Sequence, residues 1–152
     1  MYVLMDVEWY CGSGGRIFPT QLAALRTDES WDRRDRFFSR IRPDRTDTPN
    51  WTHIAFSGGE PEDFLCAPTL SAALRDLRMW LQMDDVLCWW AEEAPKVFKR
   101  LHTPLLQVPP AVPHRVLLDH VSPILISKGI AQENPYKIAT FLGLEIPTPA
   151  HC

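Results

Sequence analysis

The nine residues 1–9, MYVLMDVEW, decide the fold that this sequence predicts. They form an apolar run rich in residues that favour β-strands, and only Asp6 and Glu8 interrupt it. In a strand, the side chains at positions i and i+2 point to the same face. The sequence therefore predicts a strand from which the carboxylates of Asp6 and Glu8 project together.

Two neighbouring carboxylates repel each other, and burying them costs hydration free energy unless something neutralises them. A divalent cation does this, and hard oxygen ligands favour Mg²⁺ or Mn²⁺. The competing interpretation is that Asp6 and Glu8 face solvent on an edge strand, since isolated Asp-x-Glu pairs are common. The pair alone leaves both interpretations open.

The segments that follow predict a mixed α/β order. A glycine-rich turn at 11–15 leads to a second strand over 17–25 and a third over 36–41, which together predict an antiparallel meander. Apolar residues at helical spacing predict an amphipathic helix over 69–82, with Thr69 or Ser71 able to cap it. The unbroken apolar run 86–90 is typical of a strand buried on both faces.

The remainder of the chain predicts helices and loops. Pro95 suits the first turn of a helix, and the proline-rich stretch 106–113 predicts a loop. A further helix is expected from about residue 120 to 128, with Pro123 in its first turn, and another over 135–142. The predicted class is α/β, a mixed sheet flanked by helices.

Composition limits the classes of function. The 152 residues suit a single domain, and no apolar run approaches the ~20 residues that span a bilayer. The four cysteines are widely scattered and Met1 is followed by no basic segment, so we expect reduced thiols in a cytoplasmic protein without a signal peptide. The net charge of −3 argues against a nucleic-acid coat protein but allows an enzyme that handles phosphodiesters through bound cations.

Several segments, taken in order, resemble the DEDD superfamily of 3′–5′ exonucleases, which includes proofreading exonucleases and DnaQ-like exoribonucleases. VLMDVE at 3–8 and PTQLAAL at 19–25 look like its first motif and the returning strand. The segments that lead to the family's second motif are similar to WTHI at 51–54, APTL at 67–70 and MWL at 79–81. The strand from which the second motif emerges is similar to VLCWWA at 86–91. The run that leads to the third motif is similar to Leu118-Asp119 followed by PYKIATFLGL at 135–144, with His151 at the position of the motif's histidine.

The resemblance implies a ribonuclease-H-like fold over 1–152, a single exonuclease-like domain that could lack its C-terminal helix. It implies hydrolysis of phosphodiesters at the 3′ end of single-stranded RNA or DNA with two Mg²⁺ or Mn²⁺ ions. Asp6 would bridge the metals, Glu8 would bind one of them and orient water, and His151 would act as general base. Trp9, next to this site, is a candidate for stacking on a base.

The sequence departs from the family pattern at two motifs. Ala94 stands where the second motif has an aspartate, and Glu93 is a weak substitute that could equally be a helix-entry residue. The third-motif aspartate would fall beyond Cys152. His114 and Asp119 also have the His-x-x-x-x-Asp spacing of the third motif and are a rival candidate for it. The other interpretation of His114 is a histidine in a surface loop. The second interpretation of function is therefore a degenerate exonuclease-like module that binds nucleic acid or a protein partner without cleavage.

Overall fold

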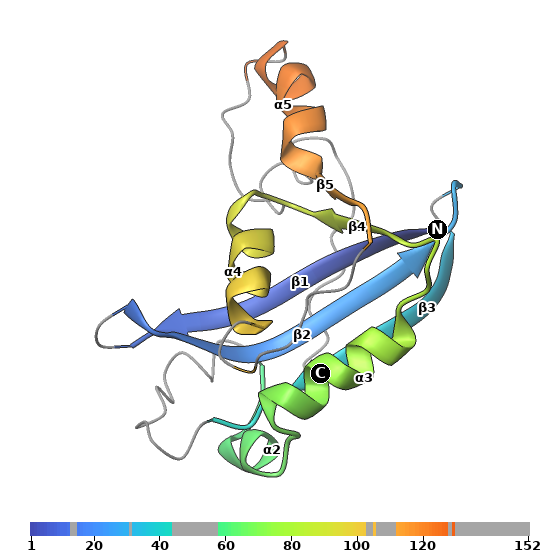
Figure 1. Ribbon diagram of the computed structural model, residues 1–152. Coiled ribbons are helices and arrows are strands. Elements are labelled where there is room, and N and C mark those ends of the chain that lie inside the picture. Colours follow the sequence, from blue (N-terminus) through green and yellow to red (C-terminus); the bar gives the residue numbers. More distant parts are fainter. Residues whose placement is uncertain are drawn as a thin grey trace.

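The computed structural model describes residues 1–12, 15–30, 32–43, 58–102, 105, 112–127 and 129. In these residues the chain forms a five-stranded mixed sheet with the strand order β3-β2-β1-β4-β5 (Figure 1). The strands are β1 (Tyr2–Cys11), β2 (Ile17–Thr27), β3 (Arg33–Arg40), β4 (Val86–Trp89) and β5 (His114–Val116). The helices are α2 (Pro61–Leu65), α3 (Leu70–Trp80), α4 (Glu93–His102) and α5 (Leu117–Ser127).

β1 is the central strand of the sheet. It pairs antiparallel with β2 and parallel with β4, while β2–β3 is antiparallel and β4–β5 is parallel. The predicted meander of three strands is confirmed, and so is the predicted mixed α/β class. β1 therefore carries Asp6 and Glu8 at the centre of the sheet rather than on an edge.

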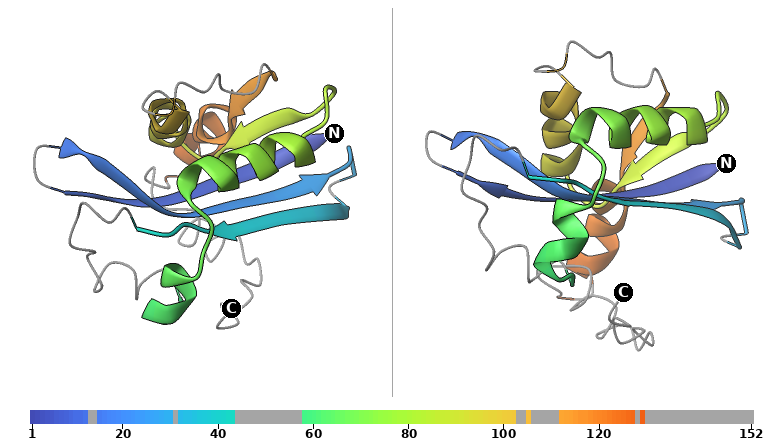
Figure 2. Two further views of the ribbon diagram at one scale, coloured as in Figure 1. Left: turned by 60° about the horizontal axis from the view of Figure 1, so that its bottom comes forward. Right: turned by 90° about the horizontal axis from the view of Figure 1, so that it is seen from below.

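The two faces of β1 differ in what covers them. Val3, Met5 and Val7 are buried, and they belong to a hydrophobic core that includes residues of α3 and α4. Figure 2 shows α3 and α4 together on this face of the sheet, with α2 and α5 on the opposite side. Strand alternation directs Asp6 and Glu8 away from the core. No helix in the described ranges is both long and apolar enough to cross a membrane.

α3 forms where the hydrophobic periodicity predicted it. Thr69 is its N-cap, and the Thr69 side chain accepts a hydrogen bond from the backbone N–H of Ala72 at 3.3 Å. The helix buries Ala73, Leu74 and Leu77 against the sheet. The predicted helix over 69–82 is confirmed, with the cap at the first of the two positions considered.

The region after α4 corrects two expectations. His114, which we expected in a loop, begins β5, and its Cα pairs with that of Leu87 in β4. α5 follows β5 directly, so Pro123 lies in the interior of the helix and not in its first turn. Because proline has no N–H, this position loses one helical hydrogen bond. The predicted helix over 135–142 lies outside the described residues.

A buried arginine joins the sheet to α3 and to the segment before β4. Arg26 is 5% exposed and makes a two-pronged contact with Asp85, which is 0% exposed, at 3.2 and 3.0 Å. It also donates to the carbonyl oxygen of Trp80 at 2.7 Å and to Asp35 at 3.2 Å. Asp85 in turn accepts from the backbone N–H of Gln82 at 2.8 Å. The network connects β2, β3, the end of α3 and the residue before β4.

A buried histidine at the end of α4 predicts a pH dependence of stability. His102 is 3% exposed, its Nδ1 lies 2.8 Å from the carbonyl oxygen of Phe98, and burial, aided by Arg78, lowers its pKa below the usual 6.5. The unfolded chain therefore takes up a proton at a higher pH than the folded chain does. The His102 contribution is present above pH 6.5 and is lost as the pH falls through the lowered pKa, with a slope of at most about 1.4 kcal/mol per pH unit. Denaturant unfolding from pH 8 to pH 5 measures this slope, and His102→Gln should reduce it; an equal slope in the variant would exclude His102 as the cause.

Candidate functional site

Asp6 and Glu8 lie side by side on the face of β1 that points away from the core. Asp6 is exposed and Glu8 is half-buried. Solvent reaches Asp6, but the surrounding protein displaces enough water to raise the pKa of its carboxyl above the usual 3.8. Hydrogen bonds with the backbone of Val7 and with the side chain of Glu8 oppose this rise. A hydrogen bond between two carboxyl groups requires a proton on one of them. A divalent cation would neutralise the ionised carboxylates and offset the cost of burying them.

This arrangement predicts that Asp6 lowers the stability of the metal-free protein. Because the pKa of Asp6 is raised in the folded state, its stabilising contribution is complete below pH 3.8 and is lost as the pH rises through the folded-state value. At pH 7 the ionised carboxylate is therefore unfavourable, and Asp6→Asn should raise the Tm by roughly 1–3 °C. Thermal unfolding in EDTA measures the change. The conservative control is Asp84→Asn on the exposed turn before β4, which should leave the Tm unchanged, and a lower Tm for Asp6→Asn would refute the explanation.

A third oxygen lies on the same face, from a residue that the sequence did not indicate. Gln21 of β2 pairs directly with Glu8, and directly opposed residues share a face of the sheet. Within the described part of the chain, the side-chain oxygen of Gln21 is buried and accepts no hydrogen bond. The register shifts next to this pair, because Trp9 lies opposite Pro19, which leaves Thr20 as an extra residue. Such a bulge re-aims side chains and commonly occurs beside active sites.

These donors fit one divalent cation. Two carboxylates and an amide oxygen are hard ligands of the kind that Mg²⁺ and Mn²⁺ prefer. An unsatisfied buried acceptor beside an acidic pair is the polar atom that a cation would satisfy. Counting only His, Cys, Asp and Glu, the described residues contain no group of three that could hold a metal ion. Asp6, Glu8 and Gln21 are therefore the described residues on this face whose oxygens could hold a cation.

The start of α4 adds no acid to this set. Ala94, at the second-motif position, presents only a methyl group and packs against the hydrophobic core. Lys96 lies 2.8 Å from Glu92 and 3.9 Å from Glu93, and the Glu93 side chain is 78% exposed. Lys96 also lowers the pKa of Glu92. Glu93 lies at the solvent-exposed entrance of the helix, and the structure does not group it with Asp6 and Glu8.

The remaining candidates are distributed elsewhere. Trp9 packs against the core, so strand alternation turns it away from the acids, and Tyr10 comes to their face instead. His114 is exposed at the start of β5, and Asp119 is exposed in the first turn of α5. His151 lies outside the described residues.

The fold matches that of solved nucleases. No protein-family model and no curated protein matched the chain. Among solved structures, an exonuclease I structure described in terms of processivity has a TM-score of 0.80 at 15% identity, covering 99% of this chain and 37% of that chain. The structure of E. coli exonuclease I in complex with a dT13 oligonucleotide has a TM-score of 0.76 at 17% identity, and the match covers 99% of this chain and 37% of that chain.

The nuclease domain of 3'hExo, a DEDDh family member bound to rAMP, gives a TM-score of 0.78 at 13% identity. The match covers 99% of this chain and 82% of that domain. By contrast, this chain spans less than two fifths of the exonuclease I chains cited above. At these identities the similarity concerns the fold. The chain has the ribonuclease-H-like fold of the DEDD exonucleases.

Proposed function

We propose that this protein is a metal-dependent 3′–5′ exonuclease that hydrolyses phosphodiesters at the 3′ end of single-stranded RNA or DNA. The observation that carries the proposal is that Asp6 and Glu8 lie on one face of the central strand, pointing away from the core. The fold shared with exonucleases supports it, as does the oligonucleotide in one of those structures.

The residues of the site would divide the work between metal binding and positioning. Asp6, Glu8 and the amide oxygen of Gln21 would hold Mg²⁺ or Mn²⁺. A bound divalent ion supplies charge neutralisation at a phosphodiester and lowers the pKa of water. Glu8 would also orient the attacking water, and His151 would accept its proton as general base.

A second candidate function is binding of nucleic acid or a protein partner without cleavage. The observation that favours it is the methyl group of Ala94 at the position where the family resemblance expects a carboxylate. Loss of one ligand removes charge stabilisation from the transition state, which is usually the largest catalytic term. Such a protein would retain the fold and a weak cation site while losing turnover.

Single-stranded RNA and DNA oligonucleotides labelled at the 5′ end, incubated with Mn²⁺, test the first candidate. An exonuclease yields a ladder that shortens from the unlabelled 3′ end, and Glu8→Gln should abolish it. Glu29→Gln, on the exposed turn between β2 and β3, is the matched control and should leave the ladder unchanged. Intact oligonucleotide that is nonetheless bound would support the second candidate, and a ladder that persists in Glu8→Gln would remove this site from the reaction.

A further inference from the structure

A row of side chains leads from the acidic pair across the sheet to β3, the outermost strand on that side. Asp6 on β1 lies directly opposite Ala23 on β2, and Ala23 lies directly opposite Phe38 on β3. Directly opposed residues share a face of the sheet, so the three side chains point the same way. Neighbouring strands are about 4.8 Å apart, which places the backbone of Phe38 about 10 Å from that of Asp6. We call Asp6, Ala23 and Phe38 the cross-strand row.

The packing of the preceding residue confirms the direction of Phe38. The Phe37 side chain packs against the core, and its ring centroid lies 6.0 Å from that of Trp80 on α3. Successive side chains of a strand alternate between the two faces. Phe38 therefore points to the face opposite α3 and α4 (Figure 2).

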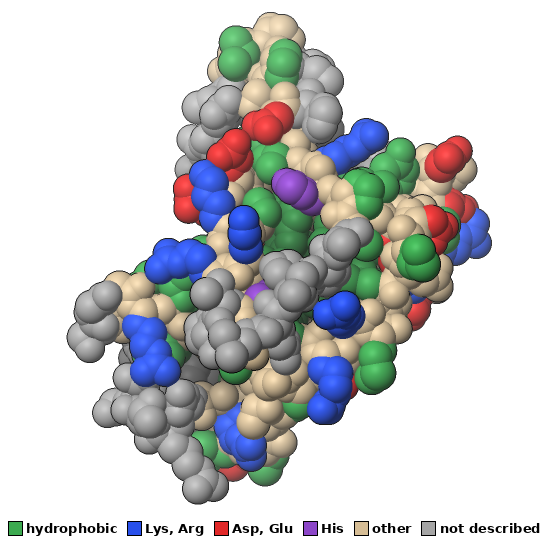
Figure 3. Space-filling view, in the orientation of Figure 1, with side chains coloured by type: hydrophobic (Ala, Val, Ile, Leu, Met, Phe, Trp, Pro, Cys, Tyr) green, Lys and Arg blue, Asp and Glu red, His purple; other side chains and the backbone are tan. Residues whose placement is uncertain are grey.

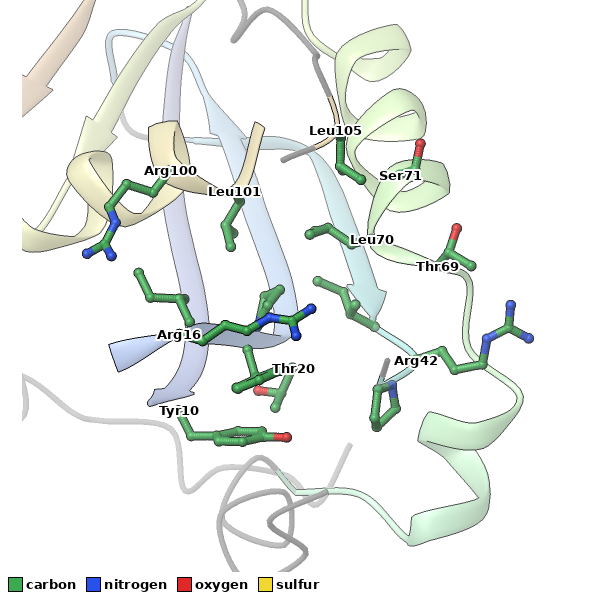
Figure 4. Close-up of a pocket in the computed structure, with 15 residues that line it drawn as sticks. Tyr10, Arg16, Thr20, Arg42, Thr69, Leu70, Ser71, Arg100, Leu101 and Leu105 are labelled. Carbon is green, nitrogen blue, oxygen red and sulfur yellow. The ribbon is translucent and has the colours of Figure 1, made fainter. Parts of the chain in front are cut away.

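Phe38 offers ring surface to a ligand. Of the aromatic side chains in the described ranges, only that of Phe38 is exposed, at 48%. A pocket of about 770 Å³ lies between the β1–β2 hairpin, the start of α3 and the last turn of α4 (Figure 4), but its rings, Tyr10 and Phe18, are each 8% exposed. Solvent must reach a ring before a base can stack on it. Phe38 meets this condition, and the rings of the pocket do not.

Arg40 holds the Phe38 ring in place. Its guanidinium carbon lies 5.7 Å from the centroid of the Phe38 ring and 5.5 Å from that of Phe64. Arg40 also donates a hydrogen bond to the carbonyl oxygen of Gly58 at 3.1 Å and pairs with Asp63 at 3.4 Å. These contacts position the ring before any ligand binds, which reduces the conformational entropy lost on stacking.

Arg36 supplies a cation beside the ring. It precedes Phe38 by two residues on β3, so it lies on the same face, and it is directly opposite Leu25. Arg36 is exposed, and the hydrogen bond that it donates within the described ranges comes from its backbone N–H, not from its guanidinium. On the opposite face, Lys and Arg side chains are spread over the helices (Figure 3), and the described residues place no exposed aromatic ring among them.

A single strand of nucleic acid matches this combination of ring and cation. Proteins that bind single strands contact phosphates with cations and stack bases on exposed aromatic rings. The short side chain of Ala23 leaves no bulky group between Asp6 and Phe38 in the row. Successive nucleotides of a stacked strand are ~3.4 Å apart, so the distance of about 10 Å corresponds to about three nucleotides.

We infer that the cross-strand row is the path of the bound strand, with a base about three nucleotides from the 3′ end stacked on Phe38 and a nearby phosphate bound by Arg36. The inference rests on the proposed function for the class of ligand and for the position of the 3′ end at the acids. Phe38 and Arg36 are binding residues and take no part in the chemistry. Affinity for a strand should therefore depend on Phe38 even when no metal is bound.

Fluorescence anisotropy of a 5′-labelled thymidine decamer in EDTA, which withholds the metal that cleavage needs, tests the inference. Phe38→Ala should weaken binding about 5–100-fold, the effect of losing one stacked ring, and Phe38→Trp should retain the affinity. Arg36→Gln should weaken binding and reduce its salt dependence by about one phosphate contact. The matched controls are Met79→Ala and Arg75→Gln at exposed positions of α3, and both should bind as the wild type does.

A decamer of the same length without bases separates stacking on Phe38 from a general structural effect. The wild type should bind this abasic decamer more weakly than the thymidine decamer, because only the phosphate contacts remain. Phe38→Ala should lose most of that difference. A difference that is unchanged in Phe38→Ala would overturn the inference.

Three further outcomes would overturn it. The first is no binding of the decamer by the wild type at about 0.1 mM protein, the weak end of non-specific affinities. The second is equal affinity of wild type and Phe38→Ala. The third is a wild-type dimer that Phe38→Ala dissociates and that excludes the decamer, which would assign the exposed ring to a second copy of the chain.

The inference and the proposed function fail separately. Cleavage that Glu8→Gln abolishes, together with equal decamer affinity of wild type and Phe38→Ala, would overturn the cross-strand row and leave the nuclease proposal in place. Binding that depends on Phe38 without any cleavage would support the row and the second candidate function.

Discussion

Asp85→Ala is expected to lower the free energy of unfolding by about 3–5 kcal/mol, a large share of the total stability of a domain of this size. The reason is that Arg26, 5% exposed, would keep its charge without its main partner. The remaining ion pair, at 3.2 Å, is with Asp35, whose side chain is 51% exposed and therefore compensates less, and the Trp80 carbonyl that also accepts from Arg26 carries no full charge. The substitution would also remove the acceptor for the backbone N–H of Gln82.

Urea or guanidinium unfolding followed by circular dichroism measures this loss, and Asp85→Asn gives a second measurement if the alanine variant does not fold. Arg34→Ala is the matched control, because the Arg34–Asp28 pair lies at the surface and exposed ion pairs contribute little. A midpoint for Asp85→Ala and Asp85→Asn that equals the wild-type midpoint would show that the buried pair does not stabilise this fold.

Ala94→Asp is expected to increase metal-dependent cleavage by about 10²–10³-fold, the scale on which a single charge-stabilising group acts at a transition state. The family resemblance assigns the second-motif acid to position 94, whereas Ala94 packs against the core in this structure, so the variant tests whether a carboxylate at this position acts together with Asp6 and Glu8. The change should be tolerated, since Ala94 is only partly buried and an acid in the first turn of α4 interacts favourably with the helix dipole.

The 5′-labelled oligonucleotide assay with Mn²⁺ measures the gain. Ala91→Asp, three residues earlier and before the helix, adds the same charge nearby and should have no comparable effect. If Ala94→Asp folds normally and cleaves no faster than the wild type, position 94 does not adjoin the catalytic site.

The parts of the fold that follow local patterns were predictable from the sequence. Alternation in β1 predicted that Asp6 and Glu8 would share a face, and helical periodicity with Thr69 predicted α3 and its cap. β5 has only three residues, of which two are exposed, so it carries too little pattern to be recognised.

The rest depends on contacts between distant residues, which spacing along the chain does not encode. Gln21 lies opposite Glu8 through the register of β1 against β2, which shifts immediately after this pair, and Arg26 pairs with Asp85 across 59 positions of sequence. These features required three-dimensional information.

The most direct measurement is the thermal unfolding of wild type, Asp6→Asn and Glu8→Gln during a Mn²⁺ titration. If the acidic pair on β1 binds a divalent ion, the wild-type protein gains about 2.7 kcal/mol of stability when the free metal reaches a hundred times its Kd, and each variant loses most of this gain. A wild-type Tm that does not respond to Mn²⁺, or an equal response in all three proteins, would contradict the metal site and the nuclease chemistry proposed for it.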